Sequence, residues 1–155
     1  MISSKNSRRS AEETPASMIN LTCIIGQQSG MEHVVSSTTA HSKVVLFFTD
    51  LAAFLSASDL SPDLILVLQH SPDEYTNIEV EELLGKFPVA RCVCCYGVWC
   101  VSMGRNRSAW PPACIVPQAD FDVRLSREHE VLSGSRPALP VTAGLDELFG
   151  FMFGA

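Results

Sequence analysis

Five short apolar runs follow one another along the chain and constrain its fold more than any other feature. They span 19–26, 43–49, 63–69, 89–96 and 113–116. Each run is rich in Val, Ile, Leu, Phe or Cys, which is typical of short strands covered on both faces. Strands of this kind usually run parallel, and parallel strands need long crossover connections. The sequence therefore predicts an α/β protein built on a parallel sheet.

Helical patterns lie between and after these runs. Asp50 can cap a short helix over 50–55, and the segment 73–86 has the spacing of a helix with one acidic face. A further helix is expected over 121–132, with Asp120 as a cap and four residues at helical spacing: Phe121, Leu125, Glu128 and Leu132. With right-handed crossovers, these elements predict a flavodoxin-like three-layer sandwich with five strands in the order 2-1-3-4-5.

The length of 155 residues fits one domain. Residues 1–18 contain almost no apolar side chains, so we expect a disordered tail there, and either Met1 or Met18 can be the natural start. The domain then covers 19–155, with a C-terminal extension from about residue 135. An apolar stretch at 138–141 predicts a strand or turn, and the amphipathic run 145–149 predicts a final docking helix.

Charge and hydropathy exclude some partners. The formal net charge is −6, which is unfavourable for a general binder of nucleic acids or anionic membranes. No apolar run approaches the length of a membrane span, and the polar N-terminus lacks the apolar core of a secretory signal. We therefore expect a cytoplasmic protein that binds neither nucleic acid nor membrane.

The connection 97–112, GVWCVSMGRNRSAWPP, carries the strongest candidates for binding. It lacks helical periodicity, so an ordered loop is expected rather than a crossover helix. Arg105 and Arg107 lie between Trp99 and Trp110, and guanidinium groups and indoles are common anchors for anions, nucleotides or proteins. A second interpretation is that both tryptophans fold back onto the sheet in place of the missing helix.

One segment, SPDLILVLQHSP at 61–72, resembles the third strand and following loop of response-regulator receivers. The likeness covers about residues 19–117, and the loop around Trp99 and Trp110 also resembles uncharacterised bacterial receiver-like proteins. The resemblance implies an acidic pair after strand one, a phospho-accepting Asp ending strand three, a Thr or Ser ending strand four and a Lys before Pro after strand five. This chain instead has Gly26-Gln27-Gln28, Leu68-Gln69 and Val116-Pro117. Aspartyl phosphorylation is therefore not expected.

The remaining candidate residues are polar groups and thiols. Gln27, Gln69 and His70 should meet at the carboxyl edge of the sheet, where folds of this class bind ligands. The cysteines at 92, 94 and 95 resemble a metal cluster, but strand alternation sends Cys94 and Cys95 to opposite faces. We expect buried core thiols and no metal site, with Cys100 as the one thiol to test for reactivity.

Two functions from different classes follow. The first is a non-enzymatic, receiver-like domain that acts as a protein-interaction or signalling module, with no cofactor and a protein partner still to be identified. The second is a small-ligand or anion sensor that binds at the carboxyl edge. A hydrolase or thiol enzyme ranks third, because no catalytic triad motif is visible. A homodimer through a sheet edge or a helix face stays open.

Overall fold

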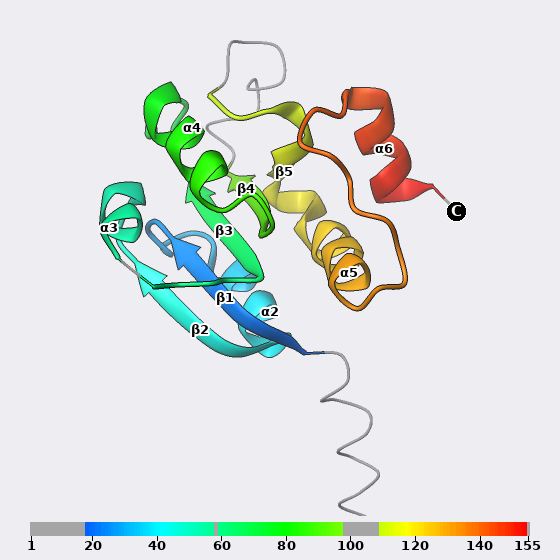
Figure 1. Ribbon diagram of the computed structural model, residues 1–155, viewed down its shortest axis with the longest axis horizontal. Coiled ribbons are helices and arrows are strands. Elements are labelled where there is room, and N and C mark those ends of the chain that lie inside the picture. The colour runs from blue at the N-terminus through cyan, green and yellow to red at the C-terminus, as the bar shows by residue number, and fades with distance from the viewer. Residues whose placement is uncertain (1–17, 58, 98–108, 155) are drawn as a thin grey trace, which may run out of the picture.

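The computed structural model describes residues 18–57, 59–97 and 109–154. A five-stranded, all-parallel sheet forms its centre, with the order β2-β1-β3-β4-β5 (Figure 1). This order confirms the predicted flavodoxin-like topology. The expected tail at 1–18 lies, except for Met18, outside the described residues, as does the central part of the 97–112 connection. The strands are β1 (Ile19–Ile25), β2 (Ser42–Phe48), β3 (Leu64–Gln69), β4 (Arg91–Tyr96) and β5 (Ile115–Pro117).

Helices cover both faces of the sheet and give the predicted three layers. One apolar core lies beneath α2 (Glu32–Ala40), α5 (Phe121–Leu132) and α6 (Leu145–Phe153). The second core lies beneath α3 (Leu51–Ser56) and α4 (Asn77–Lys86) (Figure 1). The side chain of Cys95 belongs to the first core and that of Cys94 to the second. The prediction that these adjacent thiols point to opposite faces is therefore confirmed.

Side-chain caps decide where several helices begin. Asp50 accepts a hydrogen bond from the amide of Ala53 at 2.8 Å and caps α3 as predicted. Thr76 and Glu79 form a reciprocal capping box, so α4 begins at Asn77 rather than at residue 73. The expected cap by the Asp120 side chain is wrong, because a 3-10 turn, η4 (Gln118–Asp120), leads directly into α5.

The helix α2 was not predicted from the sequence. It holds a run of four Ser and Thr residues (36–39), which have modest helix propensity. The hydroxyls of Thr38 and Thr39 donate to backbone carbonyls four residues earlier, at 2.8 Å each. Val34 and the preceding Met31 are fully buried in the first core. Burial against the sheet therefore fixes a helix that its local sequence favours only weakly.

The boundaries near β5 also differ from expectation. Residues 112–114 form a short 3-10 turn, η3 (Pro112–Cys114), so the strand begins at Ile115 instead of 113. The apolar stretch at 138–141 forms no strand and leads into a turn, and Leu139 and Ala143 are buried in the first core. The predicted docking helix is present as α6. Among the described residues, no helix is long and apolar enough to cross a membrane.

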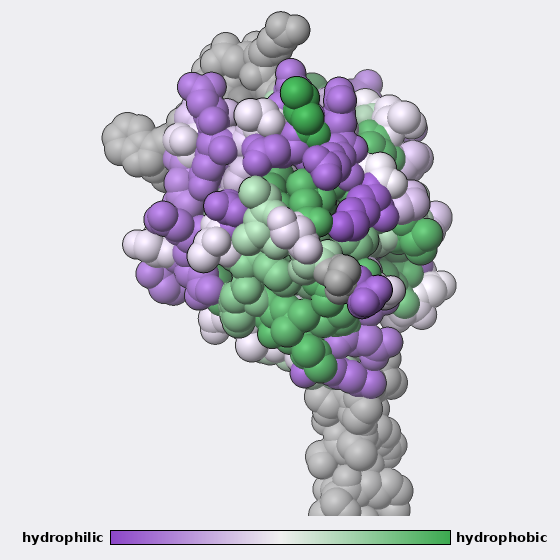
Figure 2. All heavy atoms as spheres, turned by 60° about the vertical axis from the view of Figure 1, so that its left-hand side comes forward, coloured by the Kyte–Doolittle hydropathy of each residue, from purple (hydrophilic) through white to green (hydrophobic). Residues whose placement is uncertain are grey.

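The strand β2 forms one edge of the sheet. Val44 and Phe47 on this strand are about half exposed. Figure 2 brings this side of the molecule forward and shows apolar side chains gathered over it. An edge strand with unpaired backbone groups and apolar side chains is a surface on which a second copy can add a strand. The homodimer named above stays a prediction.

Candidate functional site

The strand end at which the receiver resemblance would place the phospho-acceptor reads Leu68-Gln69, and Gln69 is the last residue of β3. Its side chain is buried, and both ends of its amide are hydrogen-bonded. Nε2 donates to the carbonyl oxygens of Ser71 at 2.9 Å and Pro72 at 3.2 Å. Oε1 accepts from the indole Nε1 of Trp110 at 2.8 Å and from the Cys94 thiol at 3.4 Å. Because an amide lacks the nucleophilic oxygen of a carboxylate, this position does not support acyl-phosphate formation.

Trp110 is a core residue. Its ring is almost fully buried in the core beneath α3 and α4, at the end of the connection that precedes β5. The structure therefore supports, for Trp110, the interpretation that an aromatic ring folds back onto the sheet. The bond to Gln69 ties this connection to the carboxyl end of β3.

His70 and Gln27 meet at the same edge, where the His70 ring bonds to the main-chain carbonyl of Gln27. The ring Nε2 of His70 lies 2.7 Å from the carbonyl oxygen of Gln27, so Nε2 carries the donated proton. The amide nitrogen of His70 donates to the Glu74 carboxylate at 2.6 Å. The ring therefore links the loop after β1 to the loop after β3.

The end of β1 is closed by a tight backbone contact. Gly26 has φ +112°, and a Cβ built there would lie 2.6 Å from the carbonyl oxygen of Leu68 and 3.0 Å from the Tyr75 hydroxyl. That hydroxyl donates to the same Leu68 oxygen at 3.3 Å. Burial raises the pKa of Tyr75 well above its usual value, so the phenol stays neutral. Only glycine fits this conformation and this space.

Three of the predicted binding residues, Trp99, Arg105 and Arg107, lie outside the described residues, and so does Cys100. The described part of the carboxyl edge brings together Gln27 with His70 and Gln69 with Trp110. In each pair the polar atoms bond within the protein. Among the described residues, no three His, Cys, Asp or Glu side chains are grouped closely enough to hold a metal ion.

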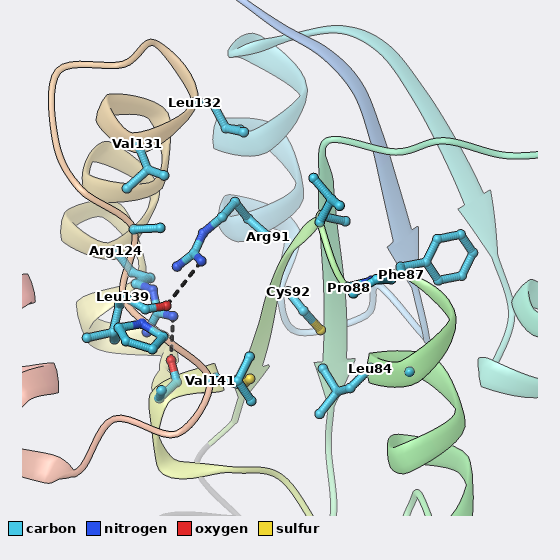
Figure 3. Close-up of a pocket in the computed structure, with 17 residues that line it drawn as sticks. Leu84, Phe87, Pro88, Arg91, Cys92, Arg124, Val131, Leu132, Leu139 and Val141 are labelled. Carbon is cyan, nitrogen blue, oxygen red and sulfur yellow. Dashed lines mark hydrogen bonds between the residues drawn. The ribbon is translucent and has the colours of Figure 1, made fainter.

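A cavity of about 610 Å³ lies at the other end of the sheet, where β4 begins. It is open to solvent on one side and is lined by the end of α4, the start of β4, α5 and the segment before α6 (Figure 3). Most of its lining is apolar, and two arginines, Arg91 and Arg124, also face it. The volume falls within the range of small-molecule sites. Sequence reasoning missed this cavity. The apolar side chains that Figure 3 labels in it are Leu84, Phe87, Pro88, Val131, Leu132, Leu139 and Val141.

The two arginines share one buried carboxylate. Arg91 donates to both oxygens of Glu128, at 2.5 and 3.2 Å, and Arg124 donates to Oε2 at 2.8 Å. The side chains of Arg124 and Glu128 are each 1% exposed, and that of Arg91 is 14% exposed. Arg124 also donates to the carbonyl oxygen of Ala113 at 2.6 Å, and its Nη1 is buried without a hydrogen-bond partner. The group therefore carries one excess positive charge in a largely apolar place.

Two thiols on the cavity wall, Cys92 and Cys114, share a hydrogen bond that shifts their pKa values in opposite directions. A hydrogen bond with Cys92 lowers the pKa of Cys114, and the positive charges of Arg124 and Arg91 lower it further against the opposing effect of burial. The same hydrogen bond, followed by burial, raises the pKa of Cys92 well above its usual value.

One sequence signal pointed to the ion group. Glu128 lies on the same helical stripe as the apolar residues Phe121, Leu125 and Leu132, and a carboxylate on a buried stripe needs a partner. Arg124, one turn earlier, supplies that partner within α5. The second partner, Arg91, is distant in sequence, and only the tertiary fold brings it there.

A separate apolar surface lies on α6. Leu145, Phe149 and Phe153 recur every four residues on one face of this helix and are 61%, 66% and 48% exposed. Phe151, on the opposite face, and Met152, beside the stripe, are buried. A groove of about 250 Å³ runs between this stripe and β5, and apart from Asp120 its lining is apolar. Contiguous exposed apolar side chains are typical of contact surfaces, unlike apolar residues scattered singly.

No family model, curated protein or solved structure matches this chain. The resemblance to receivers therefore rests on the residues of 61–72 and the strand pattern, and it stays a prediction.

Proposed function

We propose that this chain is a non-enzymatic, receiver-like interaction module of a signalling system. The observation that carries the proposal is Gln69, whose amide is hydrogen-bonded to Trp110 and Cys94 at the strand end where a receiver keeps its phospho-acceptor. At that strand end this chain has an amide held by internal hydrogen bonds in place of a carboxylate that could be phosphorylated. A domain that keeps such a fold without an acceptor can still act by contact with a protein.

The stripe of Leu145, Phe149 and Phe153 on α6 is the described surface best suited to that contact. These side chains are about half exposed or more, and covering them with a partner favours binding by roughly 25 cal/mol per Å² of buried apolar area. Phe149 and Phe153 are adjacent, with ring centroids 5.1 Å apart, and aromatic residues dominate binding energy at protein interfaces.

The test is quantitative capture of partners from a lysate of the native host by the tagged full chain. The informative variant is Phe149→Glu, which places a charge in the stripe. The matched control is Ile78→Glu on α4, because Ile78 is 75% exposed and lies on another helix. We expect one protein to be captured by the wild type and by Ile78→Glu and to be lost with Phe149→Glu. Equal capture by all three chains would remove the α6 surface from the proposal.

The alternative, a ligand sensor at the carboxyl edge, stays a second proposal of lower rank. The described polar groups there already bond one another, which leaves Gln69 and the ring of His70 less able to recognise a ligand. Thermal-shift measurements with nucleotides, flavin and phosphorylated metabolites test this alternative. A saturable shift with one of them would reverse the ranking.

A further inference from the structure

The cavity at the start of β4 combines an apolar body with one excess positive charge. We propose that it binds a small molecule that has an apolar body and a single carboxylate, and that Arg91 holds the carboxylate. This inference goes beyond the proposed function, because the cavity lies away from both the carboxyl edge and the stripe on α6.

The charge balance is the first step. Two guanidinium groups, Arg91 and Arg124, face one carboxylate, Glu128, so one positive charge has no counter-ion within the group. Glu130, two residues beyond Glu128, is engaged with Arg136 and Arg127 instead. A buried charge without a counter-charge costs free energy, so the site favours an incoming anion.

The donor geometry is the second step. Arg91 uses Nε and Nη2 on Glu128 and Nη1 on the carbonyl oxygen of Leu139 at 3.2 Å. Each terminal nitrogen of a guanidinium carries two hydrogens, so Nη1 and Nη2 each keep one further N–H. Figure 3 shows the guanidinium of Arg91 projecting toward Leu139 at the side of the cavity. Because the Arg91 side chain is 14% exposed, a ligand can reach it.

Arg124 has a different role. Its side chain is 1% exposed and is held by Glu128 and the carbonyl oxygen of Ala113. The Arg124 Cζ lies over the ring of Phe151, 5.7 Å from the ring centroid, in a cation–π contact. Arg124 therefore supplies positive potential from behind Glu128, and Arg91 makes the contact.

The apolar walls define the rest of the ligand. Val89, Leu132 and Val141 line the cavity and are exposed, Val89 to 91%. Covering these side chains with an apolar group removes apolar surface from water and so favours binding. Inorganic phosphate would leave the walls uncovered, and its dianionic form would exceed the single positive charge. A monocarboxylate with a hydrocarbon body matches both the charge and the walls.

The experiment uses octanoate as the probe and 1-octanol as its neutral counterpart, with binding to the full chain measured by calorimetry. Octanoate should bind saturably, and 1-octanol at least about tenfold more weakly, because one charge-assisted hydrogen bond is lost. Arg91→Gln should weaken the binding of octanoate by a similar factor. Lys43→Gln is the matched control, because it removes one positive charge from the exposed, opposite edge strand β2.

A second measurement needs no variant. Backbone amide chemical shifts of the wild-type chain, titrated with octanoate, should change at 84–92 and 138–141 and stay constant at 145–153. The proposal is overturned if octanoate and 1-octanol bind equally, if Arg91→Gln folds and binds as the wild type does, or if the shifts map to the groove beside α6. Absence of any octanoate binding would overturn it as well.

Discussion

The hydrogen bond between Trp110 and Gln69 can be tested by a double-mutant cycle. Trp110→Phe keeps an aromatic ring in the core but removes the indole N–H that donates to Gln69 Oε1 at 2.8 Å. Gln69→Met keeps the length of the side chain but removes the Oε1 acceptor, which also accepts from the Cys94 thiol, and the Nε2 donor to Ser71 and Pro72. Of the hydrogen bonds between described residues, the Trp110–Gln69 bond is the one lost in both variants, so the cycle reports on it.

The expected sizes follow from the burial of both residues. Trp110→Phe loses apolar contacts and leaves a small cavity, which adds roughly 1–3 kcal/mol to the cost of the lost bond. Gln69→Met loses three further hydrogen bonds, with Ser71, Pro72 and Cys94, at about 1 kcal/mol each for the two that Nε2 donates and less for the weaker one from the thiol. The coupling energy between the two changes should be about 1 kcal/mol, the net value of a buried neutral hydrogen bond.

The assay is urea unfolding of the wild type, both single variants and the double variant, followed by far-UV circular dichroism. The double variant should be less destabilised than the sum of the single variants by the coupling energy. A coupling energy below about 0.3 kcal/mol would mean that the two substitutions act independently and that their effects simply add. That result would refute the claim that this bond ties the connection before β5 to the carboxyl end of β3.

Two further predictions concern charged groups. Glu128→Gln leaves two buried guanidiniums without a counter-charge and should cost about 3–5 kcal/mol of unfolding free energy, whereas Glu130→Gln, at a more exposed ion pair, should cost less than about 1 kcal/mol. Urea unfolding measures both, and similar losses would contradict the buried ion group. Burial, followed by the charge of nearby His41, lowers the pKa of His129 below its usual 6.5. The unfolded chain then takes up this proton first, so stability should fall as the pH drops below about 6.5. His129→Gln should reduce that loss between pH 7.5 and 5.5, and an unchanged loss would count against the assignment.

The strand pattern was readable because a parallel sheet covered on both faces imposes continuous apolar runs. Leu64–Gln69 is buried at every position, which is why the run at 63–69 stood out as a strand. α2 gave no comparable signal, since its polar Ser and Thr run forms a helix only through burial of Val34 and Met31. Local sequence therefore predicted the sheet better than the helix that covers it.

The two sites differ in how far the sequence could predict them. His70 and Gln69 follow a strand end, so their place at the carboxyl edge could be deduced, although not that their polar atoms bond within the protein. The cavity depends on Arg91 meeting Glu128 across 37 residues of chain, and nothing in the local pattern of either residue specifies that contact. Long-range ion pairs of this kind require the fold.

The most direct test of the proposed interaction module is hydrogen–deuterium exchange on the captured complex, compared with the free full chain. The account predicts that binding slows amide exchange at 145–153, where the exposed stripe of α6 lies, and leaves 26–28 and 69–75 unchanged. Slower exchange at 26–28 and 69–75 without any change on α6 would contradict it, because the carboxyl edge would then be the binding surface.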